Sequence, residues 1–118
     1  MCARLLLIVG LYFVAIDTVR AADPPQEAIA FFEKRIRPIL VNNCYECHSV
    51  ESAKVKGGLL VDSRDGLLKG GDSGPAIVPG DPDKSLLVVA VRQTNKDLRM
   101  PPKQKLTEAQ IADVEAWV

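Results

Sequence analysis

Cys44-Tyr45-Glu46-Cys47-His48 is the stretch on which the interpretation of the whole chain depends. It has the C-x-x-C-H pattern that is typical of covalent haem c attachment. Two cysteines separated by two residues bring both sulfurs to one edge of a macrocycle, where each thiol can add across one vinyl group. The adjacent imidazole can then bind the iron as its proximal ligand. The motif therefore predicts haem c as the cofactor, held by Cys44, Cys47 and His48.

Other uses of the same residues remain open at this point. A dithiol redox pair usually lies in a βαβ context, and the sequence shows no such pattern. A structural zinc site uses four Cys or His ligands. The chain after residue 21 has only two cysteines and one histidine, so carboxylates would have to complete the set. A disulfide between Cys44 and Cys47 is compatible with an oxidising compartment.

The first residues have the pattern of a secretory signal peptide. A short basic region, residues 1–4, precedes an apolar segment, residues 5–16, and small residues suited to cleavage follow. The apolar segment is shorter than a typical membrane-spanning helix. We therefore expect a signal peptide over residues 1–21, export to the periplasm or cell envelope, and a mature domain over residues 22–118. A retained N-terminal anchor is the alternative, and only then would the chain associate with a membrane.

Length and charge set further limits. The chain has 118 residues, enough for one small domain, and its formal net charge is zero, so nothing in it favours nucleic acid as a partner. A mature chain this short buries a modest core. A bound haem would form part of that core.

Apolar spacing predicts a long first helix. Ile29, Phe32, Ile36 and Leu40 recur at spacings of three and four over residues 25–43, which is the helical period. Pro38 falls inside this segment and should bend or break the helix, because proline has no N–H to donate. The helix would deliver Cys44 to the haem.

Caps and turn residues predict three later helices. Asp62 with Asp65 resembles a capping box for a short helix that Gly70 and Gly71 end, and Asp81 with Pro82 opens the next. The buried face of that helix comprises Leu86, Leu87, Ala90 and Val91. The final helix has Thr107 and Gln110 as a capping box, with Leu106 packed on Ile111 and a face of Ile111, Val114 and Trp117. Residues 59–61 form a strand stub or a packing segment, and residues 93–105 form a loop.

Met100 is the candidate sixth ligand. Electron-transfer cytochromes c bind iron with His on one face and Met on the other, and no other methionine follows Met1. The neighbouring prolines restrict the backbone and lower the entropy cost of holding a ligand. The predicted iron ligands are therefore His48 and Met100. The alternative is that Met100 is an ordinary packed methionine.

The rest of the pocket is predicted less directly. A backbone carbonyl from residues 74–80 would accept the second N–H of the His48 imidazole. Lys103 and Lys105 would either steer a redox partner or form an ordinary solvated face. The residues expected to line the haem, or to be ordinary core, are Ile36, Leu40, Leu59, Ile77, Leu86 and Trp117.

The assembled motifs resemble the class I cytochrome c fold, and more closely the planctomycete-type cytochrome c domain. The resemblance covers about residues 31–118, and its stretches are residues 37–40, 56–59, 61–62, 70–75, 78–80, 85–87, 100–102 and 116–118. It implies an all-α domain wrapped around one covalently attached haem. In that family Cys44 and Cys47 would be thioether sites, His48 the proximal ligand and Met100 the distal ligand. Such domains commonly head longer exported proteins, and we expect this chain to be the N-terminal part of one.

Three functions compete. The first is an exported c-type cytochrome domain that carries single electrons to a redox partner protein or to downstream domains. The second is the haem domain of a larger oxidoreductase or a peroxidase-like enzyme. Catalysis at iron needs an open position, which Met100 would fill, and no acid/base or nucleophile set is present, so an electron-transfer domain is favoured over an enzyme. The third is a structural module without haem, closed by a disulfide between Cys44 and Cys47.

Overall fold

The computed structural model describes residues 23–118, and the signal peptide expected over residues 1–21 lies outside this range. The described chain contains no strand beyond an isolated bridge between Gly71 and Gly74, which confirms the all-α fold class. Its α-helices are α1 (Gln26–Phe31), α2 (Arg37–Asn43), α3 (Tyr45–His48), α4 (Arg64–Lys69), α5 (Leu86–Arg92) and α6 (Glu108–Trp117). Shorter helical turns are the π-helical η1 (Phe32–Ile36) and the 3₁₀ turns η2 (Lys56–Gly58) and η3 (Pro82–Lys84).

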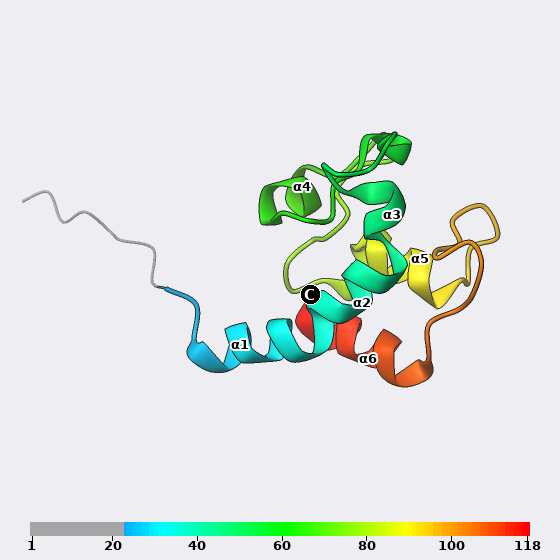
Figure 1. Ribbon diagram of the computed structural model, residues 1–118. Helices are drawn as coiled ribbons and strands as arrows, with labels where there is room; N and C mark the ends of the chain where they lie inside the picture. Colours follow the sequence, from blue (N-terminus) through cyan, green and yellow to red (C-terminus); the bar gives the residue numbers. More distant parts are fainter. Residues whose placement is uncertain (1–22) are drawn as a thin grey trace, which may run out of the picture.

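The predicted first helix exists as three consecutive segments, α1, η1 and α2. Pro38 lies in the first turn of α2, directly after the wider π turn, and the N–H of Arg37 donates to the carbonyl of Phe32. A π turn before a proline shifts the hydrogen-bond pattern and so accommodates the missing N–H. The helical path is therefore bent and not broken, and Figure 1 shows its axis changing direction between α1 and α2.

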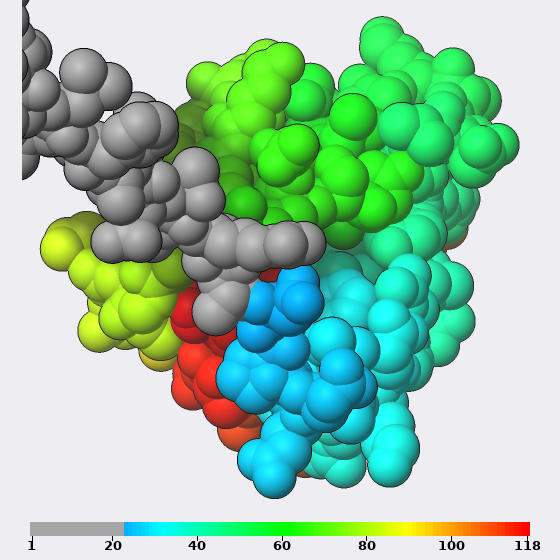
Figure 2. Space-filling model, turned by 90° about the vertical axis from the view of Figure 1, so that its left-hand side faces the viewer, coloured from blue at the N-terminus to red at the C-terminus, as the bar shows by residue number. Residues whose placement is uncertain are grey.

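The C-terminal helix α6 packs against this N-terminal segment. The rings of Phe32 and Trp117 lie with centroids 5.5 Å apart, and Arg35 forms an ion pair with Asp113 at 2.9 Å. Figure 2 shows α1 and the last residues of the chain side by side on one face. The N-terminal helical segment and α6, which are distant in the sequence, are thus packed together.

The start of α6 agrees with its sequence signature. The hydroxyl of Thr107 accepts the N–H of Gln110 at 3.2 Å, and the amide oxygen of Gln110 accepts the N–H of Thr107 at 3.0 Å. Leu106 and Ile111, on either side of this capping box, are both buried in the core. The predicted capping box is confirmed.

The predicted cap of α4 is wrong. The helix begins after Ser63, whose hydroxyl accepts the N–H of Gly66 at 3.0 Å. Asp62 instead accepts the N–H of Val50 at 2.8 Å, because the segment after α3 lies alongside residues 59–62. The predicted end is correct, since Gly70 stops the helix with a φ of 73°.

The helix α5 begins later than its sequence signature indicates. Asp81 caps the 3₁₀ turn η3, not α5, by accepting the N–H of Lys84 at 3.1 Å. Ser85 intervenes: its buried hydroxyl donates to the carbonyl of Asp81 and accepts the N–H of Val78, both at 2.8 Å. These bonds end the 3₁₀ turn and start α5 at Leu86.

The core lies between the N-terminal helical segment, α5 and α6. Its largest fully buried apolar side chains are Ile36, Leu40, Val88, Val91 and Val114. Residues 59–61 pack on this core without forming a strand, and the loop expected over residues 93–105 is present. None of the helices within residues 23–118 is long and apolar enough to cross a membrane.

Candidate haem site

A cavity of about 170 Å³ lies beside α3 and α5. Cys44, His48 and Met100 all line it, although Met100 comes from a loop far along the chain. Most of the wall is apolar and is contributed by Leu59, Val61, Ala76, Leu86, Leu87, Ala90, Val91 and Leu98. The structure thus brings three of the four predicted site residues to one apolar cavity.

The C-x-x-C-H segment is held as a tight helical turn. The N–H of Cys44 donates to the carbonyl of Leu40 at 2.9 Å, which ties the motif to the end of α2. The carbonyl of Cys44 in turn accepts the N–H groups of Cys47, at 3.1 Å, and His48, at 2.9 Å. Cys47 lies in the next turn and is half-buried, but it is not among the residues that line the cavity.

His48 is fixed through its backbone. Its carbonyl accepts the N–H of Val61 at 2.8 Å. Its Nδ1 atom is buried, and no hydrogen-bond partner for it lies within residues 23–118. The expected carbonyl from residues 74–80 is therefore not within hydrogen-bond distance. A buried polar atom without a partner is uncommon in folded proteins, and iron binding through Nε2 would leave Nδ1 free to donate.

Burial controls the chemistry of Cys44. Both Cys44 and Cys47 are free thiols, and burial raises the pKa of the Cys44 thiol to about 11. The reactive cysteines of dithiol redox motifs have lowered pKa values instead. The environment of Cys44 therefore favours a protonated, apolar-packed thiol over a redox-active thiolate. Within residues 23–118, no group of three or more His, Cys, Asp or Glu side chains could hold a metal ion.

Met100 lines the cavity and is partly exposed. It is 37% exposed, and its N–H donates to the carbonyl of Ala90 in α5 at 3.0 Å. The loop that carries Met100 is thus fixed to the helix that forms one cavity wall. A thioether is a soft ligand that suits haem iron.

The cavity can be tested for its fit to a flat macrocycle. A Cβ atom added at Gly57 would meet nothing within 4 Å, and one added at Gly74 would meet only Leu86 Cδ1 at 3.9 Å. These glycines therefore keep space along the wall that a side chain would fill. Together with the apolar lining and with His48 and Met100 in the cavity wall, this space fits haem.

The predicted lining residues divide into two groups. Leu59 and Leu86 line the cavity, whereas the other four predicted residues do not. Ile36 and Leu40 are buried in the core, and Ile77 and Trp117 are partly buried against it. Sequence reasoning missed Leu98, which has no helical period to mark it, and treated Gly71 only as the end of a helix.

Comparison with protein families agrees with this geometry. A sequence profile of the family described as planctomycete cytochrome C matches residues 44–104, which is 61 of the 118 residues. The match begins at Cys44 and includes Met100. Neither curated proteins nor solved structures gave a significant match. A match over more than half of the sequence establishes that this chain belongs to the planctomycete cytochrome C family, and membership implies a haem-binding domain.

Proposed function

We propose that this chain is an exported electron-transfer domain that binds one haem covalently. The observation that carries the proposal is the meeting of Cys44, His48 and Met100 on one apolar cavity. These residues come from α3, the junction before it and a distant loop, so only the fold brings them together. Their chemistry matches the thioether site, proximal ligand and distal ligand of a cytochrome c.

Cys44 and Cys47 would hold the group by thioether bonds. Each S–H adds across one vinyl C=C: a C–S bond forms, the vinyl π bond is lost, and the thiol hydrogen goes to the neighbouring carbon. The addition needs no external oxidant or reductant. It does require that both cysteines are free thiols at the start, as they are in this structure. The helical turn that joins the two cysteines keeps their spacing fixed.

His48 and Met100 would be the axial ligands. When bound here, haem would supply an iron that changes its charge by one electron without a change of ligands. The role of the chain is to hold an imidazole and a thioether and to exclude water with the apolar wall. Among the residues lining the cavity, Asp72 is the only carboxylate, and it is exposed. This lining favours electron transfer over proton-coupled catalysis.

One observation favours a second candidate, a peroxidase-like activity. Met100 lines the cavity and is partly exposed, so as a ligand it would be more accessible to displacement than a buried residue. Catalysis at iron would require that displacement. Peroxide-dependent oxidation of a dye by the native protein, at a rate similar to that of Met100→Ala, would support this candidate.

Export and a redox partner are part of the proposal. Residues 1–21 have a signal-peptide pattern, and c-type haem is attached after export, so the two features agree with a periplasmic or cell-envelope location. The partner would be another redox protein or a further domain of a longer chain. Nucleic acid is not expected as a partner, and a membrane only if the N-terminal segment is retained.

The test is the intact mass of the exported protein. We expect the mature chain plus one haem, retained after acid–acetone extraction because the bonds are covalent. Cys44→Ser and Cys47→Ser should each leave at most one thioether, and the double variant should lose haem on extraction. A chain mass two hydrogens below the sum of its residues and termini, without haem, would instead establish the disulfide module.

A further inference from the structure

The residue that ends α5 has an unusual backbone conformation. Gln93 has a φ of 57° and a ψ of 27°, in the left-handed region. Within residues 23–118 every other residue with positive φ is a glycine. Glycine is the usual residue at such a helix end, because a side chain there is strained. A glutamine at this position therefore requires an explanation from its side chain.

The side chain of Gln93 bridges α5 and the Met100 loop. Its amide nitrogen donates to the carbonyl of Met100 at 3.4 Å and to the carbonyl of Pro101 at 3.3 Å. The two N–H groups of the amide can serve both acceptors, and both distances exceed the usual range of about 2.7–3.2 Å, so each hydrogen bond is weak. Gln93 is half-buried and Pro101 is buried, so water competes only partly for the bond to Pro101, whereas the bond to Met100 is exposed.

Backbone hydrogen bonds also join the end of α5 to the Met100 loop. The carbonyl of Ala90 accepts the N–H of Gln93 at 3.2 Å and the N–H of Met100 at 3.0 Å. The loop thus leaves α5 and returns to the same helix end, as Figure 1 shows. Inside the loop, Leu98 donates its N–H to the carbonyl of Asn95 at 3.1 Å. The loop end that carries Met100 therefore has two anchors, Ala90 and Gln93.

We propose that Gln93 is a positioning residue for Met100: its side-chain amide fixes the Met100 and Pro101 carbonyls to the end of α5 and so keeps the thioether at the cavity. The inference rests on the proposed function, because it assumes that Met100 binds iron. In this proposal Gln93 does not bind the iron and takes no direct part in electron transfer. Its effect is on the fraction of molecules in which Met100 is in place, and that fraction scales the apparent affinity of a competing ligand.

Two variants separate positioning from stability. Gln93→Gly removes the amide and also relieves the left-handed strain, so its urea midpoint should equal or exceed that of the parent. Gln93→Glu keeps the shape but places a carboxylate oxygen against two carbonyl oxygens. Gln104→Ala is the matched control, because Gln104 is exposed in the same loop and its side chain makes no hydrogen bond to the described residues.

The readout is displacement of Met100 from the ferric haem protein by imidazole, with the sulfur-to-iron charge-transfer band as signal. Imidazole should bind about tenfold more tightly to both Gln93 variants, the change expected when two weak hydrogen bonds are lost. Gln104→Ala should match the parent. Affinities of the Gln93 variants within about twofold of the parent would overturn the inference.

Met100→Ala distinguishes failure of the inference from failure of the proposed ligation. If the parent lacks the charge-transfer band and binds imidazole as Met100→Ala does, Met100 is not a ligand and both proposals fall. If the parent and Met100→Ala differ strongly while the Gln93 variants match the parent, only the inference about Gln93 falls.

Discussion

The thiol of Cys44 lies in the cavity wall, where burial raises its pKa from 9.0 to about 11. Well below pH 9.0 the thiol is protonated in both the folded and the unfolded chain. Between these two values the unfolded chain loses its proton first, so the folded state becomes less stable as pH rises. This account concerns the chain before haem is attached, when the thiol is free.

We predict that alkylation of Cys44 in folded, haem-free protein has its pH midpoint near 11, and that the midpoint falls to about 9.0 in urea. The Cys47→Ser variant isolates this thiol, and the rate of iodoacetamide labelling by mass spectrometry measures it. An identical pH dependence with and without urea would show that the thiol is not buried.

Asp62 connects the segment that follows His48 to residues 59–62. Its Oδ2 atom accepts the N–H of Val50 at 2.8 Å, and the neighbouring Val61 donates its N–H to the carbonyl of His48. Asp62 thus acts on the backbone beside a proposed iron ligand.

We predict that Asp62→Ala lowers the free energy of unfolding by about 0.5–1.5 kcal/mol, the range for a single hydrogen bond, because the donor Val50 is exposed and water competes for the bond. Urea denaturation of the haem protein measures the loss. Asp65→Ala, an exposed residue in the first turn of α4, is the control and should change stability by less than about 0.5 kcal/mol. Equal effects of the two substitutions would contradict the assigned role of Asp62.

Among the elements, the end of α4 is closely packed against another backbone segment. Gly70 has a φ of 73°, and an added Cβ atom would clash with the carbonyl oxygen of Gly74. The backbone of the cavity wall therefore passes too close to this helix end for any side chain. Gly80 has a similar φ, 78°, but an added Cβ atom there meets nothing within 4 Å.

We predict that Gly70→Ala costs more stability than Gly80→Ala. Both substitutions should cost about 1–3 kcal/mol for the positive φ, and only Gly70→Ala adds a backbone clash that moves the cavity wall. Thermal denaturation compares the two variants, and the haem content of the purified proteins reports on the cavity. Equal losses in both would mean that the wall does not approach Gly70 as described.

The helix caps show which features could be predicted from the sequence and which could not. The capping box of Thr107 and Gln110 was predictable because its partners lie within one helical turn. The caps at Asp62 and Asp81 were not, because Asp62 pairs with Val50, twelve residues away, and Ser85 interrupts the helix expected after Asp81. Cys44, His48 and Met100 were identified from residue chemistry, whereas the space at Gly57 and Gly74 depends on which segments the fold brings together.

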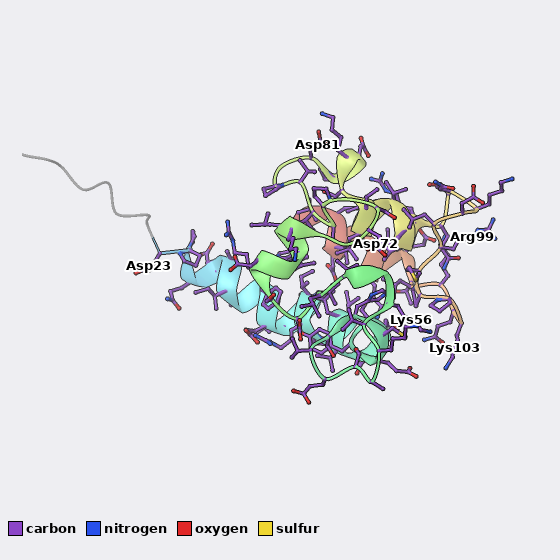
Figure 3. The ribbon with its side chains drawn as sticks, turned by 90° about the horizontal axis from the view of Figure 1, so that it is seen from above. Asp23, Lys56, Asp72, Asp81, Arg99 and Lys103 are labelled. Carbon is purple, nitrogen blue, oxygen red and sulfur yellow. The ribbon has the colours of Figure 1, made fainter. Side chains whose placement is uncertain are left out.

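At the scale of the whole molecule, zero net charge conceals a local asymmetry. Figure 3 shows Lys56, Arg99 and Lys103 on one side of the domain, and these exposed residues adjoin the loops that carry Gly57 and Met100 at the cavity, where they outnumber the exposed carboxylate of Asp72. None of the three is in an ion pair among residues 23–118. Their positions are consistent with a redox partner that carries an acidic surface.

We predict that an anionic oxidant such as ferricyanide reacts faster with the reduced protein than a cationic cobalt complex of matched driving force, and that salt reduces the difference. Lys56→Glu and Lys103→Glu should each slow ferricyanide oxidation by about two- to fivefold. Lys69→Glu, on α4, is the control. If all three substitutions change the stopped-flow rate equally, the positive charges near the cavity have no specific effect on the reaction, and the prediction is contradicted.

The absorption spectrum of the exported protein, recorded oxidised and reduced, tests the central claim most directly. The account predicts a sharp reduced α band together with an oxidised sulfur-to-iron charge-transfer band, because His48 and Met100 would hold a low-spin iron. A high-spin spectrum would contradict the role of Met100. Soluble, folded protein without any haem absorption, purified from a host that matures c-type cytochromes, would contradict the proposed function as a whole.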